Sequence, residues 1–167
     1  MPETPMFPEP QRTLITTRKE YLDAVQQMLA AANRQLRVFD PDLSELDFNS
    51  RSTVAELRRI LSGGRAHQVR IALHNVEYVS KHSPRLVELM SMFPSGIHIF
   101  RTEGEAARVQ DRFVIADETH LVRRPVAAQG RGTVLRDDPQ EGNSMVLRFE
   151  EIWASSVSAV SPTQAGL

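Results

Sequence analysis

The side chains with the clearest chemical potential lie in the stretch QDRFVIAD, residues 110–117. Its apolar centre is typical of a buried β-strand, where residues two apart share a face, so Gln110 and Arg112 project together. Asp117 closes the stretch. Burying an arginine without a counter-charge costs several kcal/mol of folding free energy. Arg112 therefore needs either a carboxylate of the protein or an anionic ligand.

More arginines follow directly after a short turn, and residues 120–125 are expected to form the second strand of a hairpin. That hairpin would gather guanidinium groups at one mouth, a geometry suited to bidentate capture of phosphate or carboxylate. The anion-binding candidates are Gln110, Arg112, Asp117, Arg123 and Arg124. The alternative is an internal salt-bridge network between these arginines and nearby aspartates. The sequence leaves both possibilities open.

Metal and thiol chemistry have little support in this sequence. There is no cysteine, which excludes thiolate metal sites and cysteine nucleophiles. The histidines are His67, His74, His82, His98 and His120. No pair has metal-ligand spacing, so neither a metal nor another cofactor is predicted, and each lone histidine is expected to be structural.

The elements that would position these residues alternate between helices and strands. Helices are expected at about 18–33, from the capping box TVAE at 53–56, from Ser83-Pro84 to Pro94, and at about 144–155. Strands are expected at 35–40, 68–74, 96–101, 110–117 and 120–125. The pattern predicts an α/β domain with a mixed, largely parallel sheet and helices on both faces.

Two polar stretches are expected to be loops. The acidic stretch DPDLSELD, residues 40–47, follows the first predicted strand and is interpreted as a solvated loop. Residues 129–143, rich in Gly, Asp and Pro, are expected to lead irregularly into the last helix.

The length of 167 residues suggests one domain, predicted to span 12–157 between a flexible Pro-rich lead at 1–11 and a tail at 158–167. A net charge of -1 argues against a general nucleic-acid coat, although a local basic patch can exist within a neutral total. No apolar run is long enough for membrane insertion, and a cytoplasmic location is expected.

The motif Gln110-x-Arg112-x4-Asp117 has the spacing of the HxKxxxxD motif of the phospholipase D superfamily. The order of elements also resembles a half-domain of that family, in which the motif strand comes late and a helix closes the domain. The segment RFEEIW, residues 148–153, resembles the aromatic part of that helix. The likeness covers most of residues 17–156. The chain is also similar to small uncharacterised proteobacterial proteins.

The resemblance implies roles for the motif residues. In that family the histidine attacks phosphorus, the lysine holds a phosphate oxygen, and two motifs meet across a pseudo-dyad or a homodimer. The matching positions here are Gln110, Arg112 and Asp117. Glutamine cannot act as the nucleophile, and losing a nucleophile costs on the order of 10⁶ in turnover. We therefore predict a catalytically inactive domain that binds a phosphate-containing or other anionic ligand or a protein partner. The expected assembly is a homodimer.

Two other hypotheses stay open. One is a metal-independent phosphodiesterase or nuclease that works as a homodimer with a relocated nucleophile, His98 or His120, so that a nucleic-acid partner also stays open. The other is an interaction domain in which the arginines only pair internally. In that case Arg112→Ala would unfold the domain by leaving Asp117 without its partner.

Overall fold

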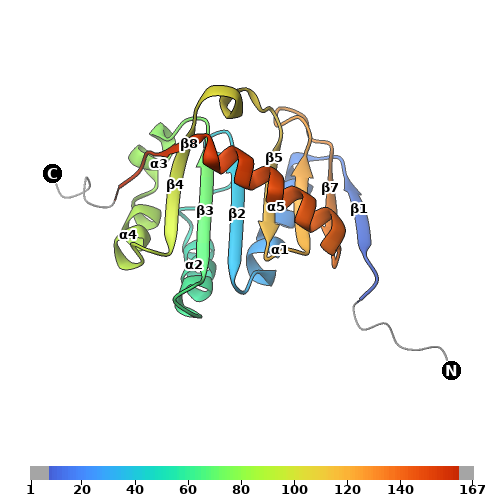
Figure 1. Ribbon diagram of the computed structural model, residues 1–167, viewed down its shortest axis with the longest axis horizontal. Coiled ribbons are helices and arrows are strands. Elements are labelled where there is room, and N and C mark those ends of the chain that lie inside the picture. Colours follow the sequence, from blue (N-terminus) through green and yellow to red (C-terminus); the bar gives the residue numbers. More distant parts are fainter. Residues whose placement is uncertain (1–7, 162–167) are drawn as a thin grey trace.

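A single eight-stranded sheet organises residues 8–161, the part of the chain that the computed structural model describes (Figure 1). The strand order is β1-β7-β6-β5-β2-β3-β4-β8. The strands are β1 Gln11–Ile15, β2 Gln35–Asp40, β3 Gln68–Leu73, β4 Ile97–Thr102, β5 Arg112–Ala116, β6 His120–Arg124, β7 Gly132–Arg136 and β8 Ser156–Ser158. The helices are α1 Arg18–Ala31, α2 Arg51–Ser62, α3 Glu77–His82, α4 Pro84–Met92 and α5 Pro139–Ala154, with a 3-10 helix at Gly104–Arg108.

The predicted mixed α/β class is confirmed, with a smaller parallel part than expected. Only β2–β3 and β3–β4 are parallel, whereas the other five pairs are antiparallel. One reason is that β1, β7 and β8 were not predicted and all pair antiparallel. β7 lies within the stretch 129–143, where flanking Gly, Asp and Pro residues hide a five-residue strand.

Helices cover both faces of the sheet, as predicted (Figure 1). Helices α1, α2 and α4 lie behind the sheet and bury the larger hydrophobic core against it. Helix α5 crosses the front face alone and buries a smaller core around Phe113 and Phe149. Because both faces are covered, the strands can be apolar on both sides, as in β5, where every residue is buried.

The starts of α1 and α2 show how local sequence sets helix ends. The Thr17 hydroxyl accepts from the Glu20 N–H, and the Glu20 carboxylate accepts from the Thr17 hydroxyl, so the first capping box is confirmed. The second prediction is wrong, since α2 is capped by Ser50 rather than Thr53. Thr53 is buried and accepts instead from the Gln26 side-chain amide.

The two ends of the described chain take part in the sheet. β1 begins at Gln11, inside the predicted lead, and β8 reaches Ser158, inside the predicted tail. Val160 is buried in the larger core, so packing continues past residue 157. The remainder of the predicted lead and tail, 1–7 and 162–167, lies outside the described residues. Within 8–161, no helix has the length and apolar character to cross a membrane.

Candidate functional site

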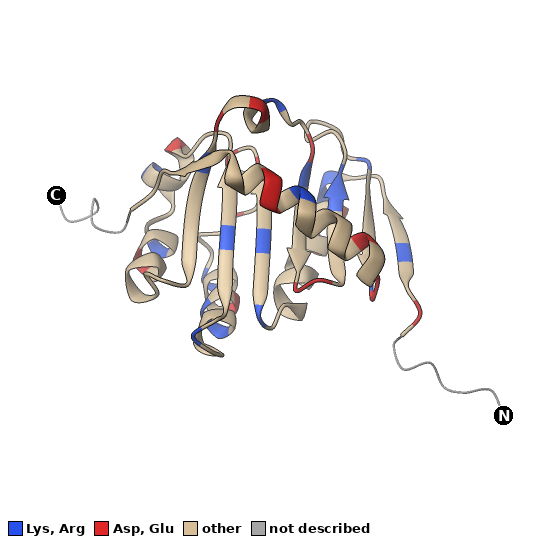
Figure 2. Cartoon of the chain, viewed as in Figure 1, with Lys and Arg blue, Asp and Glu red and all other residues tan. Residues whose placement is uncertain are grey.

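The motif residues lie on a hairpin, as expected. β5 and β6 pair antiparallel across the turn at 117–119, and Arg112 is directly opposite Arg124. Both guanidinium groups lie over the ring of Tyr21 from α1, at 5.3 and 5.2 Å from its centroid. Basic segments mark the upper ends of β5 and β6 in Figure 2. The hairpin therefore brings two arginines together on the α1 side of the sheet.

Arg112 is occupied by carboxylates of the protein itself. Its side chain is only 2% exposed, and its Nε donates to Asp40 Oδ1 at 2.7 Å while Nη2 donates to the same oxygen. Its Nη1 donates to Glu45 Oε2 at 2.8 Å. The second oxygen of Asp40 accepts from the N–H groups of residues 42 and 43. Arg112 and Asp40 therefore satisfy each other inside the fold.

Burial and pairing act in opposite directions on this ion pair. Burial raises the pKa of the Asp40 carboxyl, and the Arg112 guanidinium opposes that rise. Burial also works to lower the pKa of Arg112, but Asp40 and Tyr21 raise it overall. Each charge in this buried pair is thus held by the other, and removing one partner would leave the other uncompensated.

Arg124 is the second buried arginine of this cluster. It is 3% exposed, its Nη1 lies 3.6 Å from Glu45 Oε2, and its Nε donates to the Gln129 carbonyl. Burial and the neighbouring Arg112 charge lower the pKa of Arg124. The two buried arginines are balanced by Asp40 and Glu45, and the exposed Arg18 also pairs with Glu45, with its Nε 3.5 Å from Glu45 Oε2. Within residues 8–161, the Tyr21 hydroxyl and Arg124 Nη1 have no hydrogen-bond partner.

Asp117 binds backbone N–H groups and does not pair with Arg112. Its carboxylate accepts from the N–H groups of residues 33–35, at 2.8 to 3.3 Å, where α1 passes into β2. Its backbone has a φ of 55°, which short polar side chains tolerate better than most. The expectation that Arg112→Ala would leave Asp117 without a partner is therefore wrong. The residue left unpaired would be Asp40.

Gln110 lies just before β5 and is exposed. It lines a cleft of about 560 Å³, which we call the motif-end cleft. The lining residues are Pro41, His74, Ala107, Arg108, Val109, Gln110, Asp111, Val126, Ala127 and Ala128. The cleft is thus formed by the ends of β2 and β3 and by the loops that flank the β5–β6 hairpin.

A second group of charges adjoins this cleft through Asp111. This aspartate is 4% exposed and accepts from Arg123 Nε at 3.1 Å and from Arg148 Nη2 at 2.8 Å. The arginine side chains are 37% and 39% exposed, so each keeps N–H groups facing solvent. This group has an excess of one positive charge, and its two arginines reach solvent, in contrast to the buried Arg112.

His74 is the histidine that the fold brings to the motif-end cleft. Its Nε2 lies 2.8 Å from the Val109 carbonyl oxygen and its Nδ1 lies 2.6 Å from Thr102 Oγ1. A carbonyl oxygen only accepts, so Nε2 donates, and in the neutral ring Nδ1 accepts from the hydroxyl. Both ring nitrogens are therefore engaged. The position of His74 after β3, at a strand end where α/β proteins place ligand sites, was the available sequence signal.

His98 and His120 line other parts of the molecule. His120 pairs with Ala116, four residues along the hairpin from the Arg112–Arg124 pair and about 13 Å away. Its Nδ1 accepts from the Asp137 N–H. His98 lies on β4, with its Nε2 3.3 Å from the Ser95 carbonyl oxygen. No set of three metal-ligating side chains converges within residues 8–161.

Comparison with known proteins places this chain in a family. The family described as "Domain of unknown function (DUF7931)" matches residues 17–161, and the chain belongs to it. No curated protein matches the sequence.

Solved structures define the fold as phospholipase D-like. TrmBL2, an archaeal chromatin protein, matches with a TM-score of 0.67 and 13% identity over 94% of this chain and 56% of its own, so this chain spans little more than half its length. Nuc from Salmonella typhimurium, a phospholipase D family member, has a TM-score of 0.60 and 14% identity over 92% of this chain and 100% of its own. NucT from Helicobacter pylori has a TM-score of 0.57 and 14% identity over 90% and 100%. The resemblance predicted from the motif is confirmed for the fold.

Proposed function

We propose that this protein is a catalytically inactive phospholipase D-like domain that binds a phosphate-containing ligand at the motif-end cleft. One observation carries the proposal: the position of the motif nucleophile holds Gln110, and the next motif position holds an arginine that Asp40 already neutralises. The domain keeps the spacing of the motif, but its charged residue, Arg112, stabilises the fold through Asp40.

The lost chemistry follows from the side chains themselves. An amide nitrogen has no basic lone pair, so Gln110 cannot attack phosphorus or accept a proton at neutral pH. Each of the three guanidinium nitrogens of Arg112 donates to a carboxylate inside the protein. A phosphate oxygen would have to compete with those carboxylates for a buried cation, so stabilisation of a phosphoryl transition state is not expected there.

Ligand binding is proposed for the groups that stay accessible. Gln110 and Arg108 line the cleft and are exposed, and Asp111 connects it to the half-exposed Arg123 and Arg148. Amide and guanidinium N–H groups suit phosphate oxygens. The archaeal chromatin protein with the same fold is described as binding DNA, which supports a binding role for such a domain.

Hydrolysis tests the catalytic half of the proposal. With bis-p-nitrophenyl phosphate in a chelator, the wild-type protein is expected to release nitrophenol no faster than buffer. Turnover above that background would overturn the proposal. His98→Ala and His120→Ala proteins would then test the two nucleophiles of the phosphodiesterase alternative, and a His74→Ala protein would test the histidine that lines the cleft.

Binding tests the other half. Pyrophosphate is expected to raise the thermal midpoint of the wild-type protein, and the rise should grow with the logarithm of its concentration above the dissociation constant. The shift should shrink in Gln110→Ala and Arg108→Ala proteins and persist in Arg34→Ala, an exposed arginine outside the cleft. The absence of any shift in the wild type would remove the ligand from the proposal. The predicted homodimer and cytoplasmic location remain proposals, and sedimentation velocity tests the former.

A further inference from the structure

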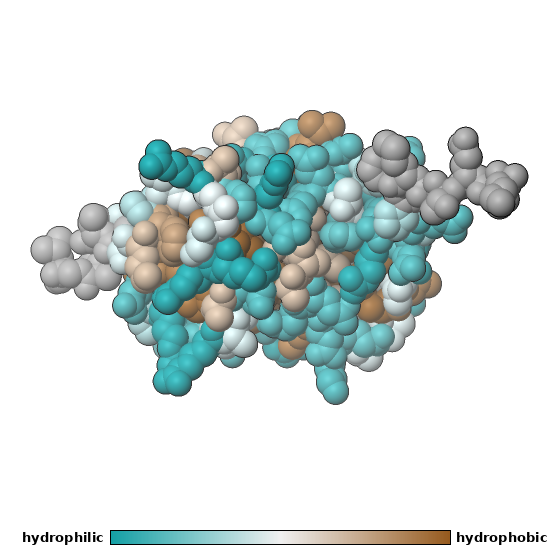
Figure 3. All heavy atoms as spheres, turned by 90° about the horizontal axis from the view of Figure 1, so that it is seen from below, coloured by the Kyte–Doolittle hydropathy of each residue, from teal (hydrophilic) through white to brown (hydrophobic). Residues whose placement is uncertain are grey.

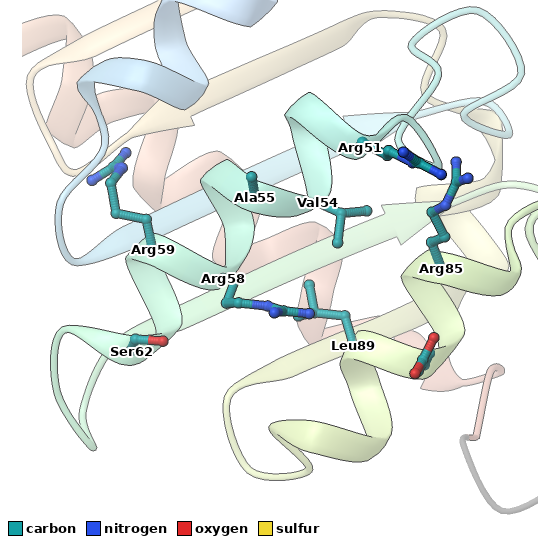
Figure 4. Close-up of a pocket in the computed structure, with 9 residues that line it drawn as sticks. Arg51, Val54, Ala55, Arg58, Arg59, Ser62, Arg85 and Leu89 are labelled. Carbon is teal, nitrogen blue, oxygen red and sulfur yellow. The ribbon is translucent and has the colours of Figure 1, made fainter.

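A groove between α2 and α4 is lined by four arginines. It has a volume of about 560 Å³ and lies behind the sheet, on the face opposite α5 (Figures 1 and 4). Its lining residues are Arg51, Val54, Ala55, Arg58, Arg59, Ser62, Arg85, Glu88 and Leu89. We call it the arginine groove.

Three of its arginines have no internal counter-charge. Within residues 8–161, no carboxylate oxygen lies within 4.0 Å of Arg51, Arg58 or Arg85. Figure 4 shows the side chains of Arg51 and Arg85 next to each other at one end of the groove. Two like charges side by side repel each other, and an anion between them would offset that repulsion.

The helices add to the charge at the same end. α2 begins at Arg51 and α4 begins at Pro84, so the partial positive charges of two helix N-termini lie beside these guanidinium groups. The Arg85 N–H and Nη1 already donate to Asn49, which orients the side chain without neutralising it. This end of the groove is therefore built to face negative charge.

Arg59 has a different role from the other three. In Figure 4 it points away from Arg51 and Arg85, on the other side of α2. It pairs with Glu56 at 2.9 Å and donates to carbonyl oxygens at the end of α1, those of Leu29 and Ala32 at 2.9 and 2.8 Å. Its charge thus serves the contact between α1 and α2.

The lining residues other than arginine indicate which class of partner fits the groove. The apolar lining residues are Val54 and Leu89, which are buried, and the small, exposed Ala55, and the lining has no aromatic ring. An amphipathic partner helix needs accessible apolar anchor sites, and a stacked base needs an aromatic face. Figure 3 shows mainly hydrophilic residues on the underside of the molecule, with small hydrophobic patches. The groove therefore favours a partner that offers negative charge to its arginines, and Glu88 adds one carboxylate to the lining.

Spacing along α2 favours a ligand with several charges. Arg51 and Arg58 are seven residues apart, two helical turns, which separates them by about 10 Å. The exposed Arg65 follows after another seven residues, just past the end of α2. A ligand with two or more phosphates matches this row of arginines better than a single phosphate does. We infer that the arginine groove binds the phosphodiester backbone of a nucleic acid and contacts its phosphates without reading bases. This inference does not depend on a ligand at the motif-end cleft.

Fluorescence anisotropy with labelled single- and double-stranded DNA and single-stranded RNA, each in two unrelated sequences, tests the inference. Wild type should bind at low salt with similar affinity for both sequences. A protein with Arg51→Ala, Arg58→Ala and Arg85→Ala should bind on the order of tenfold more weakly, and its slope of log affinity against log salt should fall by roughly 2.

A charge-matched control separates this groove from general attraction. Arg34, Arg101 and Arg131 are exposed and lie outside the groove, so changing all three to Ala gives the same net charge. The control should keep both the affinity and the salt slope. Equal losses in both triple variants, or no binding of any oligonucleotide by wild type, would overturn the inference. So would binding of polyglutamate with an affinity equal to that for DNA, because the partner class would then be an acidic protein.

Discussion

Arg112 and Arg85 are arginines of the same fold with opposite surroundings. Arg112 is buried, and every guanidinium nitrogen donates to a carboxylate of the protein. Arg85 lies beside another arginine at the mouth of a groove, and no carboxylate oxygen of the described residues lies within 4.0 Å of it. A buried cation must be neutralised from within, whereas an exposed one can be neutralised by solvent ions or by a ligand.

The comparison shows that an arginine at a motif position can serve the fold while accessible arginines lie elsewhere in the same domain. The motif position draws attention because its neighbours are apolar and its spacing resembles that of an active family. The burial that makes it stand out in the sequence also requires an internal partner. The exposed arginines of α2 and α4 carry no such signal, because a charged residue on the outside of a helix is ordinary.

Among the changes that test this comparison, Arg112→Ala should have the largest effect on stability. We expect a loss of about 3–5 kcal/mol in the free energy of unfolding, because Asp40 would be left buried without its partner. Urea unfolding followed by circular dichroism measures it. Replacing both residues, with Arg112→Met and Asp40→Leu, should recover much of the loss. A folded Arg112→Ala protein of unchanged stability that had lost pyrophosphate binding would show that Arg112 serves a ligand after all.

Arg59 tests whether a groove arginine can be structural. Arg59→Ala should cost roughly 1–2 kcal/mol in the free energy of unfolding, because it removes hydrogen bonds from a cation to carbonyl groups at the end of α1. Arg58→Ala in the same helix is the matched control and should change stability by no more than about 0.5 kcal/mol. Equal costs for the two variants would remove the distinction that we draw within the groove.

Arg51 and Arg85 test the opposite case, in which removal of an exposed arginine does not lower stability. Removing one of them, with Arg51→Ala, should leave the thermal midpoint unchanged or slightly raised at low salt, because repulsion between neighbouring guanidinium groups is relieved. The increase should vanish at about 0.5 M salt, where such charges are screened. Differential scanning calorimetry at both salt concentrations is the measurement. A fall in the midpoint at both would mean that Arg51 supports the fold.

The carboxylates show the same contrast, since Asp40 is buried and Glu20 is exposed. The smallest effect on stability is expected for Glu20. Hydrogen bonds from the Thr17 hydroxyl and from Thr16 lower the pKa of the exposed Glu20 below 4.5. A folded-state pKa below the unfolded value gives stability that is present above the unfolded pKa and is lost as pH falls through the folded one. Glu20→Gln should therefore be slightly less stable than wild type at neutral pH, and the difference should disappear as pH falls below the folded-state pKa of Glu20. A difference that is constant with pH would contradict this assignment.

Local signals in the sequence predicted much of the fold. The capping box at Thr17, the hairpin around residues 117–119 and the four longer helices follow from short-range patterns of polarity. Strands such as β1 and β8 escaped prediction because they are short and sit at the edges of the sheet, where one side is open to solvent and the hydrophobic pattern is weak. β7 was hidden by turn-forming neighbours.

The sequence by itself determined the α/β class, the motif spacing and the absence of a nucleophile at Gln110, because these depend on residue types and local order. Only the tertiary structure decided that Arg112 pairs with Asp40, the last residue of a predicted strand 72 residues earlier in the chain. It also decided that α2 and α4 present their arginines to one groove. Such pairings depend on which strands and helices become neighbours, and spacing along the chain does not record that.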